Sequence, residues 1–325
     1  MLDLFSLVKS SGAYKIIEKQ KEANAFSHAY LIEHGDKDYL KEYLKIIVRL
    51  ILRKNGDILY NARLDKLIDS ESYSDVLFFP KNGTDVKTED VNALIEESYI
   101  KPIENENKIF VIANGENMNA SAQNKLLKTL EEPPKNVIIL IGATNDFSLL
   151  PTVKSRLNKL TIAPFSDGQL FETLKKDLSD EEKLKEAIAC SDGTVGKVIS
   201  LYNNEKLHGL IDLSKDMLIN MQSSKDVLSY SVKVSATKEV QEFISVTELL
   251  LRDLLCYYTK QEESVKNKTA LKDTKTAKGF SVGAIVYALE KLNEAEKRSY
   301  FHSNPTVLVD YLLFQILEGK YKWQK

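Results

Sequence analysis

Short apolar runs alternate with helical patterns through the first half of the chain. These runs are rich in Ile, Val, Leu and Phe and occupy residues 28–33, 75–80, 108–113, 136–143 and 157–163. Runs this short and this continuously apolar predict strands buried on both faces, and the helical patterns between them predict parallel connections. The first half therefore predicts an α/β domain built on a parallel sheet.

The pattern changes to helix alone after Pro164. Pro164 ends the last predicted strand, and Ser166 or Asp167 is placed to cap a helix that runs toward Leu178. A break containing two glycines, at 191–196, interrupts this short helical unit, and a longer helical region follows. We predict an α/β domain over 1–164, a small helical domain over 165–208 and a larger all-α domain over 209–325.

Two amphipathic stripes support helices in the last region. The first comprises Phe243, Ile244, Val246, Leu249, Leu250, Leu254 and Leu255, and the second comprises Val307, Leu312, Leu313, Ile316 and Leu317. Between them, residues 261–278 are rich in lysine and poor in large apolar side chains, which predicts a mobile surface loop.

Residues 118–134, with the sequence MNASAQNKLLKTLEEPP, form the most informative helical pattern. Its Met, Ala and Leu positions recur every three or four residues, so one face can pack against a sheet. Glu131 and Glu132 end the helix where the helix dipole favours cations, and Pro133 and Pro134 prevent its continuation. This acidic terminus suggests an interface with a partner; the alternative is a solvated helix end.

Composition places the chain among ordinary soluble proteins. Its 325 residues are 43% hydrophobic and 28% charged, with a formal net charge of -2. No apolar run is long enough to span a bilayer, and the N-terminus makes a poor signal peptide, so we expect a cytoplasmic protein with no membrane partner. The charge balance provides no overall attraction to nucleic acid, so any DNA contact requires a local basic patch or other subunits.

Cysteine usage limits the metal chemistry. Cys190 and Cys256 lie far apart within helical patterns, which excludes a disulfide framework and a zinc site built from CxxC pairs. We expect both to be core or half-buried residues and no metal to be bound.

The loop after the first predicted strand stands where a phosphate-binding loop would be. A P-loop has the pattern GxxxxGK[ST], whose amides, lysine and hydroxyl hold phosphates and Mg²⁺. Residues 34–41 of this chain read HGDKDYLK, with Gly35 as the one glycine, no GK[ST] and two aspartates. Lys37 is more simply a solvated charge than a phosphate ligand.

The third predicted strand lacks the acidic end with which an ATPase holds Mg²⁺ and polarises water. It ends in Ala113 and Asn114, neither of which ionises, and Glu116 follows in a turn that we expect to aim it elsewhere. Two independent defects in one site predict that this chain does not hydrolyse ATP.

Several segments resemble the bacterial clamp-loader ATPases of DNA polymerase III, a AAA+ family. Residues 118–134 are similar to the AxNALLKxLEEPP block of that family, residues 150–156 (LPTVKSR) to its LPxTIxSRC segment, and residues 28–31 (HAYL) to the strand before its P-loop. Asn304 and Pro305, with Leu308, Leu312 and Leu313, resemble its collar helix. The resemblance implies a AAA+ module with a degenerate nucleotide site over 1–164, a helical lid over 165–208 and an oligomerising collar over 209–325.

The resemblance also implies a role without hydrolysis, in a subunit that supports ATP-driven loading of the sliding clamp onto primed DNA within the polymerase holoenzyme. Arg156 would reach the γ-phosphate of ATP bound with Mg²⁺ by a neighbouring motor (gamma/tau) subunit, supported by Ser155, while this chain binds no nucleotide. The delta subunit, the clamp and primer-template DNA would be further partners. Lys125 and Lys128 would face DNA or, equally, form a solvated helix face.

The chain departs from the family pattern at several positions. Leu157 replaces the cysteine after the Ser-Arg pair, and residues 50–75 lack the cysteines of a zinc module. Gly196 stands at a sensor arginine position, beside Lys197, and the phosphate-sensing positions Thr144 and Asn145 would instead cap or turn the chain. Two alternatives stay open: a divergent but active AAA+ ATPase of replication or repair, and a stand-alone AAA+-like adaptor.

Overall fold

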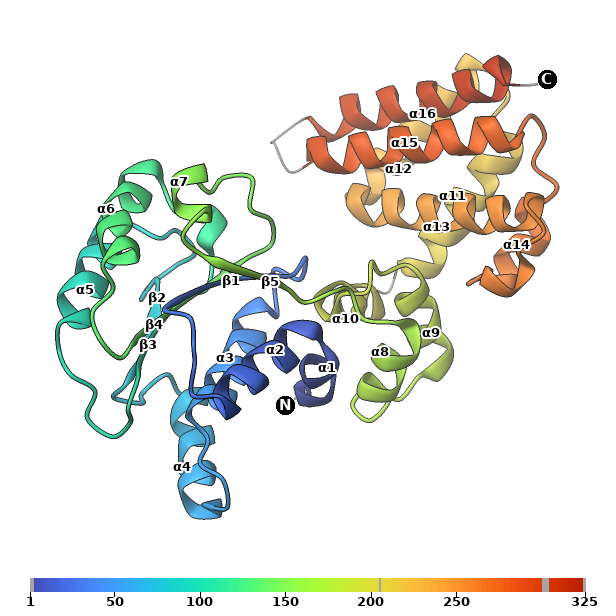
Figure 1. The fold of residues 1–325 in the computed structure, drawn as a ribbon. Helices are drawn as coiled ribbons and strands as arrows, with labels where there is room; N and C mark the ends of the chain where they lie inside the picture. Colours follow the sequence, from blue (N-terminus) through green and yellow to red (C-terminus); the bar gives the residue numbers. More distant parts are fainter. Residues whose placement is uncertain (1–2, 205, 300–303, 324–325) are drawn as a thin grey trace. The chain divides into compact units, whose positions relative to one another are not determined.

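The computed structural model describes residues 3–204, 206–299 and 304–323, and the chain divides into two compact units (Figure 1). Unit 1 comprises Met1–Ser179 with Gly193–Gly196, and unit 2 comprises Asp180–Asp192 with Lys197–Lys325. The domain boundaries predicted after residues 164 and 208 stay predictions.

Unit 1 contains the predicted parallel sheet. Its strands are β1 (Ala29–Glu33), β2 (Val76–Phe79), β3 (Lys108–Ile112), β4 (Val137–Ala143) and β5 (Asn158–Thr161), in the order β2-β3-β4-β1-β5 with every pair parallel. The five predicted runs are thus confirmed as strands. The expectation of burial on both faces is wrong for β5, in which Leu160 alone is buried. The reason is its sequence, NKLT, in which the three side chains other than Leu160 are polar and stay exposed or half-buried.

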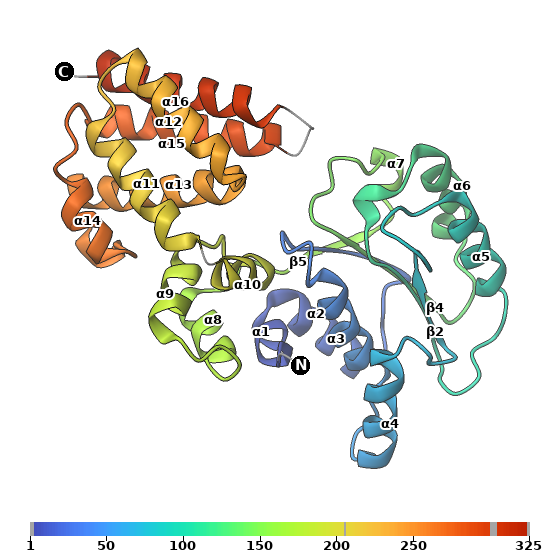
Figure 2. The same cartoon turned by 180° about the vertical axis from the view of Figure 1, so that it is seen from behind.

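Helices cover both faces of the sheet, as the two opposite views show (Figures 1 and 2). One face carries α5 (Thr88–Ser98), α6 (Ala120–Glu131) and α7 (Pro151–Lys154), whose apolar side chains share a core cluster with strand residues. Against the other face lie α2 (Gly12–Glu22), which contacts β5, and α3 (Leu40–Leu52), which contacts β4. The remaining helices of this unit are α1 (Phe5–Ser10), α4 (Ile58–Asp69) and α8 (Asp167–Leu174), and the 3-10 turn η1 (Gly115–Asn117) follows β3.

The informative segment 118–134 folds largely as predicted. Asn119 caps α6 by accepting the Ala122 backbone N–H at 2.9 Å, and the helix ends at Glu131 before the two prolines. Its apolar face enters the core cluster through Met118, Ala122, Leu126 and Leu130. Burial of that face holds the helix firmly against the sheet, because apolar area removed from water is its main stabilising term.

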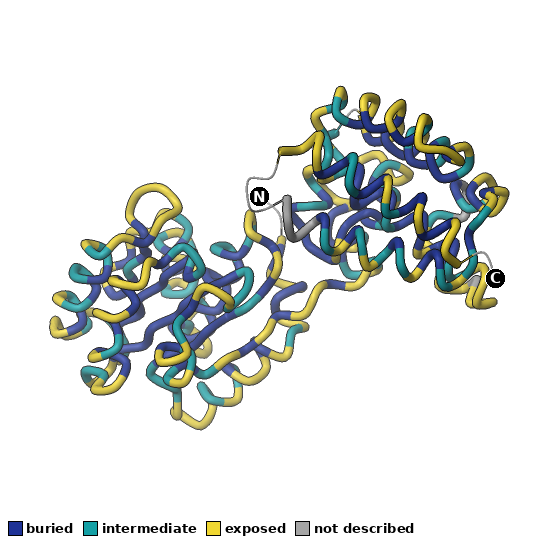
Figure 3. The backbone as a smooth tube through the Cα atoms, turned by 90° about the horizontal axis from the view of Figure 1, so that it is seen from above, coloured by how far each residue is buried: buried dark blue, intermediate teal, exposed yellow. Residues whose placement is uncertain are grey.

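Unit 2 is all-helical, as predicted. Its helices are α9 (Glu181–Ala189), α10 (Val195–Asn203, of which Val195 and Gly196 belong to unit 1), α11 (Leu207–Asn220), α12 (Ser224–Thr237), α13 (Val240–Tyr258), α14 (Lys268–Thr274), α15 (Val282–Ser299) and α16 (Pro305–Lys322), with the 3-10 turn η2 (Glu262–Ser264). The helix α15 packs on α13 and α16, and α11 packs on α13. Buried positions follow the inward sides of these helices (Figure 3). Both predicted stripes are largely buried, but Val307 is exposed.

The loop predicted over residues 261–278 is wrong, because this segment contains η2 and α14. Asn267 caps α14 by accepting the Ala270 backbone N–H, and Asp253 accepts the backbone N–H groups of Lys266 and Asn267. Ala270 and Thr274, four positions apart, are buried where α14 packs on α11 and α13. The burial uses small side chains, so the sequence showed no large apolar stripe.

A buried lysine joins α16 to the end of α11. Lys320 of α16 is 1% exposed, and its Nζ donates to the carbonyl oxygens of Leu218 (2.8 Å) and Met221 (2.9 Å) at the end of α11. The ring of Phe280 lies 4.6 Å from the same nitrogen. Carbonyl groups at a helix end lack partners within the helix, and the lysine satisfies them. Burial lowers the pKa of Lys320 to about 8.

The Lys320 pKa predicts a pH dependence of stability. Between pH 8 and 10.5 the unfolded chain keeps a proton that the folded chain has lost, so the free energy of unfolding rises with pH. The difference in free energy of unfolding between the native chain and Lys320→Met should increase by about 3 kcal/mol over this range, in favour of the native chain. Urea unfolding of the full chain, followed by fluorescence of Trp323, measures the difference; Lys322→Met on the exposed side of α16 is the control. A pH-independent difference contradicts the prediction.

Candidate functional site at the carboxyl edge of the sheet

The loop after β1 is built around a buried carboxylate. Asp36 is 3% exposed, and its Oδ1 accepts the Tyr39 backbone N–H at 3.2 Å. Its Oδ2 accepts the Tyr43 hydroxyl at 2.8 Å and the Gly196 backbone N–H at 3.0 Å. Tyr39 is the N-cap of α3, and Gly196 lies in the first turn of α10. A side-chain anion therefore occupies the type of position at which a helix N-terminus binds phosphate.

Aromatic side chains fill the space beside this carboxylate. The rings of Tyr43 and Phe165 each lie 5.1 Å from the His34 ring, and His34 Nδ1 donates to the Ile162 carbonyl oxygen at 2.9 Å. Burial lowers the pKa of His34, which keeps it neutral, and burial together with Asp36 raises the pKa of Tyr43, which keeps its hydroxyl protonated as a donor. Gly35 and Lys37, predicted from the sequence to be degenerate positions that bind no nucleotide, are exposed at the surface of this loop.

Gly196 is required by the same contacts. A Cβ at this position would lie 2.6 Å from Asp36 Oδ1 and 2.9 Å from Asp38 Oδ2, closer than side-chain carbons approach oxygen. Any side chain at this position, including the arginine expected at a sensor position, would require the Asp36 and Asp38 carboxylates to move. Gly196 therefore leaves the space that the buried Asp36 carboxylate occupies.

The end of β3 carries no acidic group of its own. Ala113 is buried, and Asn114 Nδ2 donates to the Thr84 carbonyl oxygen at 3.1 Å. Glu116, which we expected to point elsewhere, instead accepts the Thr144 hydroxyl at 2.8 Å, so the two sequence positions are brought together at this edge. Asn145 turns the chain as predicted, because its Oδ1 accepts the Phe147 backbone N–H at 3.1 Å.

Arg156 lies just after α7, with its side chain 34% exposed. Its Nη1 donates to the Thr152 carbonyl oxygen at 2.7 Å and to Ser155 Oγ at 3.1 Å, while Ser155 Oγ donates to Thr152 as well. Its Nη2 lies 2.6 Å from Glu131 Oε1 at the end of α6. The structure thus joins Arg156, Ser155 and Glu131, which the sequence assigned to two separate predicted features.

Gln123 is a residue that the sequence reasoning missed. Its side chain is 2% exposed and donates to the carbonyl oxygens of Met118 (2.8 Å) and Ser148 (2.9 Å), while its Oε1 accepts the Leu150 backbone N–H at 2.7 Å. These bonds tie α6 to the start of α7. A lone amide on the apolar side of an amphipathic helix was the available signal, since buried polar groups need partners.

The other predicted contact residues lie on α6 and immediately after its end. Lys125 and Lys128 are exposed, and Lys125 Nζ donates to Asn92 Oδ1 at 3.0 Å. Glu132 is exposed at the helix end, where its backbone N–H donates to the Lys128 carbonyl oxygen. Their roles at DNA or at an interface stay predictions.

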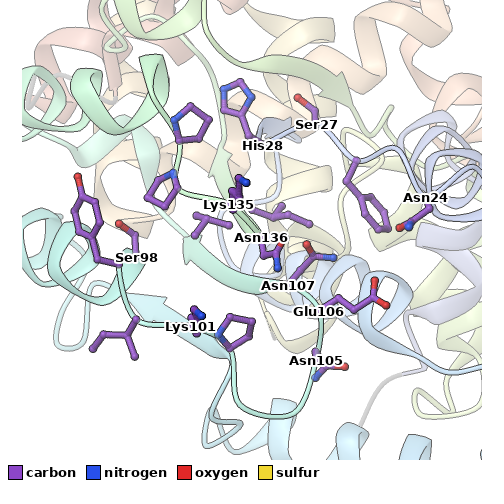
Figure 4. Close-up of a pocket in the computed structure, with 18 of the residues that line it drawn as sticks. Asn24, Ser27, His28, Ser98, Lys101, Asn105, Glu106, Asn107, Lys135 and Asn136 are labelled. Carbon is purple, nitrogen blue, oxygen red and sulfur yellow. The ribbon is translucent and has the colours of Figure 1, made fainter.

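Pro133 and Pro134 line a groove of about 990 Å³ at the opposite, amino-terminal edge of the sheet (Figure 4). Polar side chains from several loops surround this groove, and the nearby Tyr99 is 70% exposed. Glu131, which pairs with Arg156 at 2.6 Å, precedes these prolines by two residues.

The described residues contain neither a metal-binding cluster nor a membrane-spanning helix. Across residues 3–204, 206–299 and 304–323, no three His, Cys, Asp or Glu side chains group as a metal site. In the same part of the chain, no helix is long and apolar enough to cross a membrane. Cys190 is buried and Cys256 half-buried, as expected, and both line one cavity of about 210 Å³ in unit 2.

The chain is similar in sequence to subunits of DNA polymerase III. The family model described as DNA polymerase III, delta subunit, matches residues 9–166. The chain is 22% identical over 320 residues to DNA polymerase III subunit delta' of Bacillus subtilis, covering 94% of this chain and 95% of that protein. It is 30% identical over 154 residues to subunit delta' of Pseudomonas aeruginosa, covering 47% and 44%. A solved gamma subunit-related protein from Thermotoga maritima is 18% identical with a TM-score of 0.46, covering 94% and 99%.

Proposed function

We propose that this chain is a delta'-like subunit of a DNA polymerase III clamp loader and that it does not hydrolyse ATP; the match of residues 9–166 to the delta-subunit family model and the similarity to subunit delta' support this proposal. In this role it supports the loading of a sliding clamp onto primed DNA by motor subunits that bind ATP and Mg²⁺. It contributes Arg156 to a nucleotide held by a neighbouring motor subunit.

The observation that carries the first part of this proposal is the Asp36 carboxylate. A P-loop surrounds the phosphates with backbone N–H groups and a lysine. Here the corresponding helix N-terminus already donates to Asp36, and a bound phosphate would meet a second anion at that place. Like charges in close contact repel, so nucleotide binding would require displacement of a hydrogen-bonded, buried side chain.

The chemistry of Arg156 supports its proposed contact with a nucleotide held by a neighbouring subunit. A guanidinium is permanently charged and planar, and it matches the paired oxygens of a phosphoryl group. Its partial exposure and its attachment to a short helix leave it able to reach beyond this chain. Supplied to a neighbouring subunit, it would stabilise the charge that develops on the transferred phosphoryl group.

Nucleotide binding by the isolated chain tests the non-hydrolysing role. We expect equilibrium dialysis with radiolabelled ATP and Mg²⁺ to detect no saturable binding at millimolar ATP. The motor subunit of the same organism serves as a positive control in the same buffer. Saturable, Mg²⁺-dependent binding together with turnover would replace this proposal by a divergent ATPase.

Co-purification tests the assembly. Mixed with its motor and delta subunits, the chain is expected to elute in one complex on gel filtration and to be needed for clamp loading onto primed DNA. Elution of the chain alone, with clamp loading unaffected by its omission, would favour an adaptor outside replication.

A further inference from the structure

We propose that Glu131 is a positioning residue that covers Arg156 until a nucleotide phosphate replaces it. This inference rests on the proposed function, because it concerns the same arginine and the same phosphate. It adds a regulatory contact within the chain: a carboxylate that holds the arginine in a resting pair and suppresses hydrolysis when the neighbouring site has not closed.

The two terminal nitrogens of Arg156 are held in different ways. Nη1 donates to groups close to it in sequence, the Thr152 carbonyl oxygen of α7 and Oγ of Ser155 just after that helix. Nη2 is paired with Glu131 Oε1 at 2.6 Å, across 25 residues of sequence, from the end of another helix. Release of Nη2 therefore breaks a single side-chain pair and leaves the support of Nη1 in place.

The ion pair between Glu131 and Arg156 is weak enough for a phosphate to replace Glu131. The side chains of Glu131 and Arg156 are 50% and 34% exposed, and ion pairs with this much exposure contribute little because water screens them. A phosphate offers the same kind of anionic oxygen with more charge, in a bidentate geometry and in a site that excludes water. When the neighbouring subunit closes, the phosphate would thus replace Glu131 as the partner of Arg156 Nη2.

The location of Glu131 favours this role over helix stability. It is the last residue of α6, where the helix dipole disfavours a carboxylate, and the main-chain capping bond there is made by the backbone of Glu132. Because α6 is anchored in the core and joined to the α7 segment through Gln123, the carboxylate is presented to Arg156 from a rigid support.

The test uses the reconstituted loader with the Glu131→Gln chain, in which the neutral amide keeps the shape but loses the charge. We expect its ATPase rate without DNA to rise roughly two- to fivefold, the effect of losing an exposed ion pair. The DNA-stimulated rate should stay near the native value, so the stimulation ratio falls. Thermal unfolding and assembly should match those of the native chain.

Two further variants distinguish a specific contact between Glu131 and Arg156 from a general effect of local charge. Glu132→Gln makes the same charge change one residue away and should raise the basal rate less; an equal rise would assign the effect to local charge and overturn the proposal. In the Glu131→Gln, Arg156→Ala double variant the rise should disappear. An unchanged basal rate in Glu131→Gln, or a fall in both rates, also overturns it. If Arg156→Ala alone has no effect, the proposed function fails instead.

Discussion

Replacing Arg156 by alanine should slow hydrolysis at the one motor site that it faces by about 10³- to 10⁵-fold, the contribution of an arginine supplied in trans. The physical reason is the loss of a fixed positive charge beside the phosphoryl group as negative charge develops on it. In a single-turnover experiment with the reconstituted loader, primed DNA and clamp, the fast phase should lose the amplitude that belongs to that site.

The matched control is Arg63→Ala, which removes another exposed arginine whose guanidinium pairs with Glu104 at 2.8 Å. Arg156→Ala removes the donors to Thr152 and Glu131 but no buried side chain, so its unfolding curve should match the native one. Arg156→Lys keeps the charge without the planar fork and should recover only part of the rate. A full native burst in Arg156→Ala would remove this residue from the mechanism.

Replacing Asp36 by alanine should lower the free energy of unfolding by about 3–5 kcal/mol, because bonds from three donors to one buried carboxylate are lost. The donors are the Tyr39 and Gly196 backbone N–H groups and the Tyr43 hydroxyl, and the bonds from Gly196 and Tyr43 are buried. Urea unfolding of the full chain, followed by far-ultraviolet circular dichroism, measures the loss. Hydrogen exchange at the two amides should accelerate in the variant.

Asp38→Ala is the control for this substitution, since Asp38 lies in the same loop but is exposed. Its stability should stay within about 0.5 kcal/mol of the native value, as for most surface changes. Excess ATP with Mg²⁺ should stabilise neither variant. A loss below about 1 kcal/mol in Asp36→Ala would mean that water replaces the carboxylate and that it does not organise the loop.

Much of unit 1 was predictable because its elements are marked by local patterns. The strands were found from short apolar runs, since burial on both faces of a parallel sheet leaves no polar alternation. The strand β5 was misjudged, because its four residues, NKLT, are mostly polar although the longer run that contains them has apolar residues at its ends. The helix α14 was missed for a related reason: Ala270 and Thr274 are buried by the helices that surround them rather than by their own hydrophobicity.

The candidate site likewise contains features that the sequence shows and contacts that it does not show. The absent GK[ST] and the apolar end of β3 were visible because these motifs are contiguous, so each can be inspected residue by residue. The contact of Asp36 with Gly196 spans 160 residues, and that of Glu131 with Arg156 spans 25. No local pattern predicts such pairs, because they depend on how helices pack.

By itself, the sequence determined that the first half is a parallel α/β fold, that the rest is helical, and that the residues of a working phosphate site are missing. Only the tertiary structure decided what stands in their place: a buried aspartate bonded at two helix N-termini, and an arginine paired with the end of α6. Periodicity and contiguous motifs record local chemistry, whereas the partners of a charged side chain are set by the packing of distant segments.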